Sequence, residues 1–114
     1  MSPLLKMLRS IELFKAHREE VTIQRIEAFL LVAMRQRATR TEIAEATNSS
    51  LSSAARNLEA LTTRKYRINM YTYEGLGLLH EEPDPADTRR LVYTLTNKGQ
   101  RVADQIRAII GDYP

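Results

Sequence analysis

Residues 39–61 constrain the fold of this chain most, because they have the capping and turn pattern of two short helices joined tightly. Thr39 precedes Glu42 by three residues, a spacing at which hydroxyl and carboxylate each cap a free backbone N–H at a helix start. Asn48 tolerates the left-handed conformation of a sharp turn, and Ser50 can cap the helix that follows. These signals predict a helix-turn-helix.

The apolar residues of the same segment predict how the two helices pack. In the second helix, Ala54, Leu58 and Leu61 follow one another at spacings of four and three residues and so form one buried stripe. In the first helix, Ile43 and Ala44 lie on the inner side, and Ala44 is small enough for the second helix to cross closely over it.

The opposite side of the second helix is polar and has no acidic side chain. Arginine can fork onto guanine, asparagine can pair with adenine, and short hydroxyls let the backbone approach phosphates. This composition favours a helix that lies in the major groove of DNA, although a solvated serine-rich surface remains an alternative, since serine is common at helix starts. The residues concerned are Ser49, Ser50, Ser52, Ser53, Arg56 and Asn57.

A β-hairpin is predicted further along the chain. Residues 91–95 alternate with the period of a half-buried strand, and residues 78–82 supply a partner strand. The PDPADT segment between them is rich in turn formers, and Arg89 and Arg90 stand on its returning edge, as expected of a wing that enters a minor groove or clamps phosphates. The alternative is a solvated hairpin whose arginines pair with nearby carboxylates, namely Glu81, Glu82, Asp84 or Asp87.

The chain resembles the MarR family of winged-helix repressors over roughly residues 20–110, in the segments EIAEATNSSLSSAARNLEAL, GLL, DPADTRR and LTNKG. The resemblance implies a mainly α fold with a small β-hairpin wing, a MarR-like winged helix-turn-helix. It also implies a role for individual residues: groove contacts for Ser50, Ser52, Ser53 and Arg56, a wing contact for Arg89, and the holding of Arg89 in place for Asp87.

Residues 63–74 depart from the family pattern, because members of the family usually turn directly from the recognition helix into the next strand. This insert interleaves basic and aromatic residues, and three roles are open: a longer recognition helix, a loop that touches the DNA backbone, or a cover for a partner surface. Its basic residues Arg64, Lys65 and Arg67 join Arg40 and Arg90 among the predicted DNA contacts. Its tyrosines are of a kind more often packed against the domain than stacked on bases, so direct contact with nucleic acid and packing stay equally open. They are Tyr66, Tyr71 and Tyr73.

The two terminal helices, expected at residues 3–17 and 97–110, each have an apolar stripe. Such stripes are buried well if two copies pair through them, which would present two recognition helices about one DNA turn apart; the alternative is packing on the chain's own domain. The second C-terminal helix of the family is missing after Gly111, so the family's dimer geometry and ligand pocket are not carried over. The stripes comprise Leu4, Leu8, Ile11 and Phe14, and Val102, Ile106, Ile109 and Ile110.

We therefore expect a single winged-helix domain over residues 1–114, with dimerisation segments at 1–20 and 97–114 around a DNA-binding core at 39–96. The chain has 17 basic and 14 acidic side chains, an excess that agrees with a small nucleic-acid binder but is modest.

Several classes of protein and site are excluded by what the sequence lacks. Without cysteine there is no disulfide or thiolate metal site, and no apolar run is long enough for a membrane span or a secretory signal, so a cytoplasmic protein is expected. His17 and His80 are not spaced with carboxylates as a metal or catalytic site would require. We expect no enzyme, no cofactor and no metal, and the sequence gives no support for a small-molecule effector.

The first hypothesis is a dimeric, sequence-specific transcriptional regulator, expected to be a repressor, that binds pseudo-palindromic double-stranded DNA. The second is an accessory or architectural winged helix that marks a DNA site in replication, plasmid transfer or phage assembly, with the insert as a docking surface. The third is a winged helix used only for contact between proteins.

Overall fold

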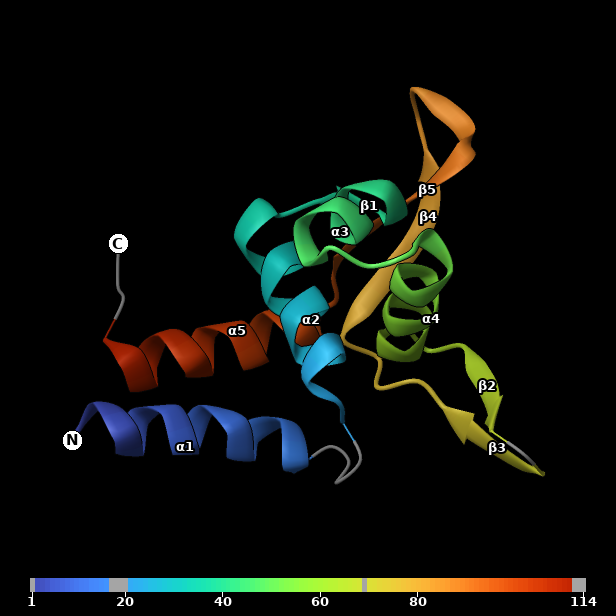
Figure 1. Cartoon of the computed structure of the whole chain (residues 1–114). Helices are drawn as coiled ribbons and strands as arrows, with labels where there is room; N and C mark the ends of the chain where they lie inside the picture. The colour runs from blue at the N-terminus through green and yellow to red at the C-terminus, as the bar shows by residue number, and fades with distance from the viewer. Residues whose placement is uncertain (1, 17–20, 69, 112–114) are drawn as a thin grey trace.

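The computed structural model describes residues 2–16, 21–68 and 70–111. Figure 1 shows α1 and α5 side by side at one end, α2 to α4 in the middle, and two hairpins that project beyond them in different directions. The elements in chain order are α1 (Pro3–Lys15), α2 (Ile23–Arg35), β1 (Ala38–Thr39), α3 (Arg40–Thr47), α4 (Leu51–Leu61), β2 (Lys65–Ile68), β3 (Tyr71–Glu74), β4 (Leu79–Asp84), β5 (Asp87–Leu95) and α5 (Asn97–Ile110).

The predicted helix-turn-helix is confirmed by α3 and α4. The Thr39 hydroxyl accepts a hydrogen bond from the Glu42 N–H at 3.2 Å, and the Glu42 carboxylate accepts one from the Thr39 N–H at 2.9 Å. This bond from the Thr39 N–H is the main reason that the pKa of Glu42 lies below its usual value. Asn48 ends α3 with φ 52° and ψ 45°, in the left-handed region, and the Ser50 hydroxyl caps α4 by accepting from the Ser53 N–H at 3.1 Å.

A hydrophobic core joins the helix-turn-helix to α2, α5 and the sheet. The predicted stripe of α4 is buried, and it packs with Ile43 of α3 and with apolar residues of α2 and β4. Phe14 joins α1 to this core, because its ring meets that of Phe29 in α2 edge to face, with 5.5 Å between the centroids. Large side chains that are fully buried include Phe29, Val32, Ile43, Leu58, Leu61, Leu78, Leu79, Val92 and Tyr93.

The wing is an extension of a three-stranded antiparallel sheet with the order β1-β5-β4. The predicted hairpin is confirmed: β4 pairs with β5 from Leu79 and Leu95 to Asp84 and Asp87, with an irregularity at Pro83/Asp84. The short strand β1, which sequence patterning did not predict, pairs with the other edge of β5. Since β5 runs from the core to the wing tip, the wing is continuous with the central sheet.

The insert forms a second, separate hairpin, in which β2 pairs only with β3 within the described residues. It does not lengthen the recognition helix, because α4 ends at Leu61 and the Thr62 hydroxyl donates to the Glu59 carbonyl at 2.7 Å. The hairpin closes at Gly75, whose N–H donates to the Arg64 carbonyl at 2.8 Å. A Cβ at Gly75 would lie 1.8 Å from the Thr62 carbonyl oxygen, so only glycine fits this close approach.

Part of the dimer surface that was predicted on the terminal helices is buried within the domain instead. Phe14, Val102 and Ile106 are 2%, 2% and 9% exposed because they pack in the core of their own domain, so they are not available to a second copy. Ile109 is half-buried. The four remaining residues of the two stripes are exposed: Leu4, Leu8, Ile11 and Ile110.

Within the described part of the chain, no helix is long and apolar enough to cross a membrane. The same residues contain no cluster of histidine and carboxylate side chains suited to a metal ion. His80 is exposed on β4, whereas His17 lies outside the described residues.

Candidate nucleic-acid interface

The N-terminal turn of α4 presents a group of exposed hydroxyls. Ser49 bonds to the Thr47 hydroxyl at 2.8 Å, and Ser50 lies 2.9 Å from the Ser53 hydroxyl and 3.3 Å from that of Ser52. Ser49, Ser50 and Ser52 are exposed, and Ser53 is half-buried. Each hydroxyl has one donor and two acceptor positions, so the group keeps hydrogen-bonding capacity for a ligand.

Arg56 is exposed one turn further along α4. Its guanidinium lies 3.4 Å from the Ser53 hydroxyl. None of the ion pairs between described residues involves Arg56, so its charge is not neutralised by a neighbouring carboxylate. The arrangement suits an arginine that reaches outward from a recognition helix.

Asn57 lies at the edge of this outward surface and is less exposed than the predicted contact would favour. It is half-buried and lines a small hollow of about 40 Å³ with Gln24 and Glu27 of α2. The reason is helical geometry: Asn57 lies three residues after Ala54 and one before Leu58, which places it at the edge of the buried stripe.

At the wing tip, Arg89 is the most exposed of the paired arginines, with a side chain that is 90% exposed. Asp87 accepts hydrogen bonds at 3.1 Å from both the backbone N–H and the Nε of Arg89. These bonds hold the pKa of the Asp87 carboxyl below its usual value, the side-chain bond being the larger cause. The contact between Asp87 and Arg89 that the family resemblance implied is therefore present.

The wing and the start of α4 lie on the same side of the molecule. A hollow of about 230 Å³ separates them, with Leu51 of α4 on one side and Arg89 and Leu91 on the other. The start of α3 closes it through Thr39, Arg40 and Thr41. The start of α4 and Arg89 therefore line one concave surface.

Arg40 was predicted to contact DNA, but it is part of an internal polar network. Its Nε donates to the Tyr93 hydroxyl at 2.9 Å and its Nη2 to Glu59 at 2.7 Å, while the guanidinium lies over the Tyr93 ring. The Tyr93 hydroxyl donates to Glu81 at 2.6 Å. Because Arg40 is only 28% exposed and already shared among these groups, its role is structural.

The pKa values in this network reflect its partial burial. Desolvation is the largest cause that raises the pKa of Tyr93 above its usual range, and the bond to Glu81 adds to it. Burial alone would lower the pKa of Arg40, but the Tyr93 hydroxyl and the two carboxylates, Glu59 and Glu81, raise it overall. Tyr93 therefore stays neutral and Arg40 charged at any physiological pH.

Arg64 anchors the insert to the same network. Its Nη2 lies 2.6 Å from Glu81 and its Nη1 lies 3.5 Å from Glu59. Lys65 is exposed and stands opposite Glu74 in the ladder, and the side chain of Arg67 lies outside what the structure describes. The charge of Arg64 is therefore already neutralised within the domain.

Arg90 lies next to Arg89 in the outer part of the wing and pairs with Asp84. Its Nη2 is 2.7 Å from Asp84 Oδ2, and Arg37 reaches Asp84 Oδ1 at 2.8 Å. The Ala86 N–H and then the Arg90 guanidinium are the main causes of the lowered pKa of Asp84, and the same pairing raises the pKa of Arg90. The alternative that wing arginines pair with local carboxylates thus holds for Arg90 and, at the tip, for Arg89.

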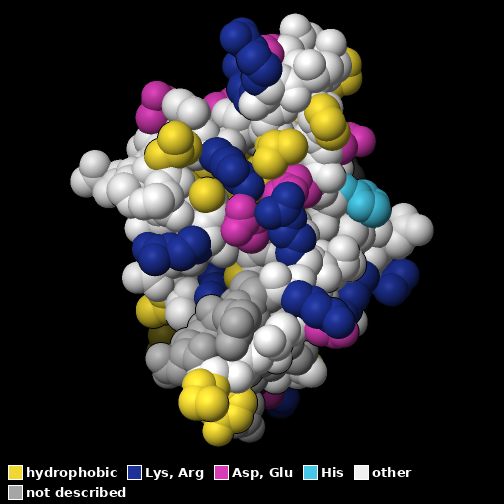
Figure 2. Space-filling view, turned by 90° about the vertical axis from the view of Figure 1, so that its right-hand side faces the viewer, with side chains coloured by type: hydrophobic (Ala, Val, Ile, Leu, Met, Phe, Trp, Pro, Cys, Tyr) yellow, Lys and Arg dark blue, Asp and Glu magenta, His cyan; other side chains and the backbone are white. Residues whose placement is uncertain are grey.

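Figure 2 views the molecule from the side on which the two hairpins project. Basic side chains are spread over this face from the wing end downward, with acidic side chains among them near its centre. The face is not a uniform positive surface, which agrees with the modest net charge of +3. Any contact with DNA would therefore depend on a few placed residues rather than on a broad electrostatic field.

The sequence did not reveal which residues join distant segments, although arginine–carboxylate and arginine–tyrosine pairs are common. Arg37 and Asp84 are 47 positions apart, and Arg40 and Tyr93 are 53 apart. No local spacing announces such pairs, because the sheet brings them together only when β1 and β4 align on β5.

The structure is similar to those of MarR-type regulators. A mutant of MarR from E. coli complexed with operator DNA matches with a TM-score of 0.63 and 16% identity, over 94% of this chain and 69% of that one. The adhesin competence repressor of Streptococcus pyogenes matches with a TM-score of 0.59 and 22% identity, over 94% and 72%. A protein from Mycobacterium tuberculosis matches with a TM-score of 0.68 and 19% identity, over 92% and 63%.

No protein-family model and no curated protein sequence matches the chain. The structural likeness confirms the predicted fold: the chain is a MarR-like winged helix. It spans 63% to 72% of the length of these three structures.

Proposed function

We propose that this protein binds double-stranded DNA in a sequence-specific manner and regulates transcription. The observation that supports this most is that the start of α4, through Leu51, and Arg89 of the wing line one hollow. The hydroxyls of Ser50 and Ser52 and the side chain of Arg56 are exposed on the same helix. Short hydroxyls at a helix start suit phosphates and base edges, and an exposed arginine on a narrow hairpin suits a minor groove. A protein of the same fold, MarR from E. coli, has been crystallised with operator DNA.

The proposed regulator acts as a dimer. The outer side of α1 exposes Leu4, Met7, Leu8 and Ile11, and Ile110 is exposed at the end of α5. The two helices lie together, since Lys6 Nζ donates to the Ile110 carbonyl at 3.3 Å. Exposed apolar side chains grouped on adjacent helices favour pairing with a second copy, because burial removes them from water.

A dimer would determine both the kind of DNA site and the kind of regulation that we propose. Two copies related by a two-fold axis would recognise an inverted repeat with half-sites about one helical turn apart. Occupation of such a site in a promoter blocks other proteins, so we propose a repressor. No enzymatic activity is part of this proposal.

The test compares Arg56→Ala and Arg89→Ala with Arg101→Ala, a control that removes an exposed arginine of α5. Arg56→Ala should relax the preference for the selected sequence over a scrambled duplex by about 1–3 kcal/mol. Arg89→Ala should weaken binding to all duplexes and reduce the salt slope by about one. The control should bind as the wild type does.

The opposite result is as informative. If both variants bind every duplex as the wild type does, the proposed groove and wing contacts are wrong. If the wild-type protein shows no salt-dependent affinity for any duplex, DNA binding itself is refuted, and a winged helix that contacts only proteins becomes the better explanation.

A further inference from the structure

The turn end of β4, near the wing tip, contains a carboxylate that is buried although its neighbours are exposed. Asp84 is 5% exposed, whereas the two prolines beside it, Pro83 and Pro85, are exposed. It lies where the ladder between β4 and β5 becomes irregular, at the last residue of β4 before the turn. A carboxylate buried near the end of a projecting hairpin needs strong hydrogen-bond partners.

Three segments supply those partners. Asp84 Oδ1 accepts from the Ala86 N–H at 2.9 Å and from Arg37 Nη2 at 2.8 Å. Asp84 Oδ2 accepts from Arg90 Nε at 3.0 Å and from Arg90 Nη2 at 2.7 Å. Arg37 comes directly after Gln36, the left-handed residue that ends α2, so the carboxylate joins the wing to the body of the domain.

The two ion pairs of Asp84, with Arg37 and with Arg90, border an open hollow between the wing and α3. Arg37, Asp84 and Arg90 line a hollow of about 550 Å³, together with Thr41 and Glu42 at the start of α3. A hollow of that size means that apolar packing does not hold this side of the wing against the helix-turn-helix. The ion pair between Arg37 and Asp84 connects this end of the wing with the residues that follow α2.

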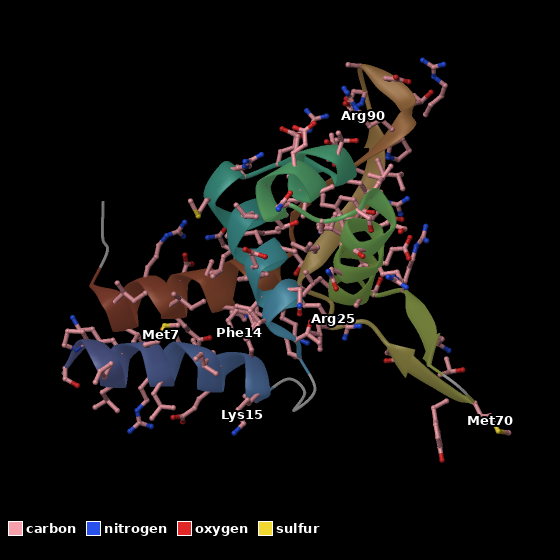
Figure 3. The ribbon with its side chains drawn as sticks, viewed as in Figure 1. Met7, Phe14, Lys15, Arg25, Met70 and Arg90 are labelled. Atoms are coloured by element: carbon pink, nitrogen blue, oxygen red, sulfur yellow. The ribbon has the colours of Figure 1, made fainter. Side chains whose placement is uncertain are left out.

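We propose that Asp84 is a positioning residue that fixes the direction of the wing and thereby the place of Arg89 on DNA. The inference rests on the proposed function, because it concerns the contact that the wing would make. Arg89 lies next to Arg90 on β5, and the turn together with Asp87 and Thr88 separates both from Asp84. A change in the angle of this end of the wing therefore moves Arg89 with it. Figure 3 shows Arg90 on the wing, at the upper end of the molecule.

Arg37 and Arg90 act through Asp84 rather than on DNA directly. Their shared carboxylate holds both guanidinium groups at the turn end of β4, where they restrain the hairpin before DNA arrives. A restrained wing loses less conformational freedom on binding than a free one, which favours affinity. Asp84→Asn removes the negative charge while keeping the shape of the side chain, so it should release this restraint.

The experiment uses the full chain and the duplex with the highest affinity in a selection from random sequences. Asp84→Asn should lower affinity about tenfold while the base preference at the positions read by α4 is retained. Hydroxyl-radical protection should fade at the flanks of the site and persist at its centre. Arg37→Gln should lower affinity in the same way, and Arg37→Lys should restore part of it, since it keeps the charge.

A double-mutant cycle separates positioning from direct contact. Asp84→Asn combined with Arg37→Gln should bind no more weakly than Asp84→Asn alone, because both changes break one bridge. If Arg37→Gln still lowers affinity in the Asp84→Asn background, Arg37 contacts DNA itself and the proposal is overturned. Unchanged affinity and flank protection in Asp84→Asn would overturn it equally.

Hydrogen exchange of the free protein tests the restraint on the wing independently of DNA binding. Asp84→Asn and, should that variant not fold, Arg37→Gln should speed exchange of the wing amides around residues 87–90 and leave those of α4 unchanged. Unchanged wing exchange refutes the restraint. Faster wing exchange in a protein that binds no duplex confirms the restraint but refutes DNA binding.

Discussion

Two antiparallel hairpins project from this domain, and both contain basic residues, yet they are built differently. The β4–β5 wing is continuous with the three-stranded sheet, and its strands bury Leu79, Val92 and Tyr93. The β2–β3 hairpin is a separate two-stranded sheet, held at its base by Arg64 and Gly75. Figure 3 shows their labelled residues, Arg90 and Met70, at opposite ends of the molecule.

Position in the fold, more than basic composition, distinguishes the hairpin to which we assign the proposed DNA contact. The wing lies beside the start of α4, across the hollow that Leu51 and Arg89 line. The other hairpin follows the end of α4, and Met70 and Tyr71 at its outer end are exposed apolar residues. An isolated two-stranded hairpin is only marginally stable, so the two hairpins should also differ in what they contribute to stability.

The largest expected effect contrasts one substitution in each hairpin. Leu79→Ala removes a side chain that is 1% exposed and should lower the free energy of unfolding by about 2–5 kcal/mol, because it leaves a cavity. Tyr71→Ala changes a residue that is 69% exposed and should alter it by less than about 0.5 kcal/mol. Urea unfolding measures both, and equal losses would contradict the structural difference between the hairpins.

The second prediction concerns the two arginines that share Glu59 and Glu81. Arg40→Ala should lower the free energy of unfolding by about 1–3 kcal/mol. The reason is that the Tyr93 hydroxyl loses the hydrogen bond that it accepts from Arg40 Nε, in addition to the loss of the ion pairs. Arg64→Ala should cost under about 1 kcal/mol, since its side chain is more exposed. Chemical denaturation of both variants decides the order; a larger loss for Arg64→Ala would mean that the insert is integral to the core.

The third prediction follows from the lowered pKa of Asp84. A carboxyl with a folded pKa below its ordinary 3.8 stabilises the fold above that pH and loses this contribution as the pH falls through the folded pKa. Asp84→Asn should therefore have a lower Tm than the wild type at neutral pH, and the gap should close as the pH falls below 3.8. Thermal unfolding of both proteins across this range measures the gap.

The matched control for that series is Glu74→Gln, which neutralises an exposed carboxylate of the other hairpin. It should change Tm little at any pH. A gap between wild type and Asp84→Asn that stays constant down to low pH would show that the carboxylate charge is not what holds the wing.

The smallest effect is expected when the β2–β3 hairpin is removed. The Gly75 N–H already bonds to the Arg64 carbonyl, so residues 65–74 can be replaced by Asn-Gly, which closes a two-residue turn at that position. Affinity for the selected duplex should change by less than about twofold, because rim residues remote from an interface contribute little. Gel-shift titration tests this, and a large loss would make the insert a DNA contact after all.

Local signals in the sequence predicted most of the helical framework. The capping pair of Thr39 and Glu42, the turn at Asn48 and the cap at Ser50 all depend on residues within three positions, and the structure confirms each. The wing was predicted from period-two alternation, and its strand limits differ by only a few residues.

What the sequence did not reveal depends on long-range pairing. The strand β1 is two residues long, which is too short for any periodicity. It forms because β5 offers it a free edge at Val92 and Tyr93. Arg40 was assigned to DNA from its charge alone, and only the arrival of Glu59, Glu81 and Tyr93 makes it internal. The burial of Phe14, Val102 and Ile106 was equally hidden, since an apolar stripe does not say which surface covers it.

The central claim is that the surface between α4 and the wing reads duplex DNA. The most direct measurement is selection of bound duplexes from a random library, followed by a salt titration of the winning sequence and of its scrambled counterpart. We predict recovery of an inverted repeat that binds with a steep salt slope and at least about a thousandfold more tightly than the scrambled duplex. Weak binding with no sequence preference, or none at all, would contradict the claim.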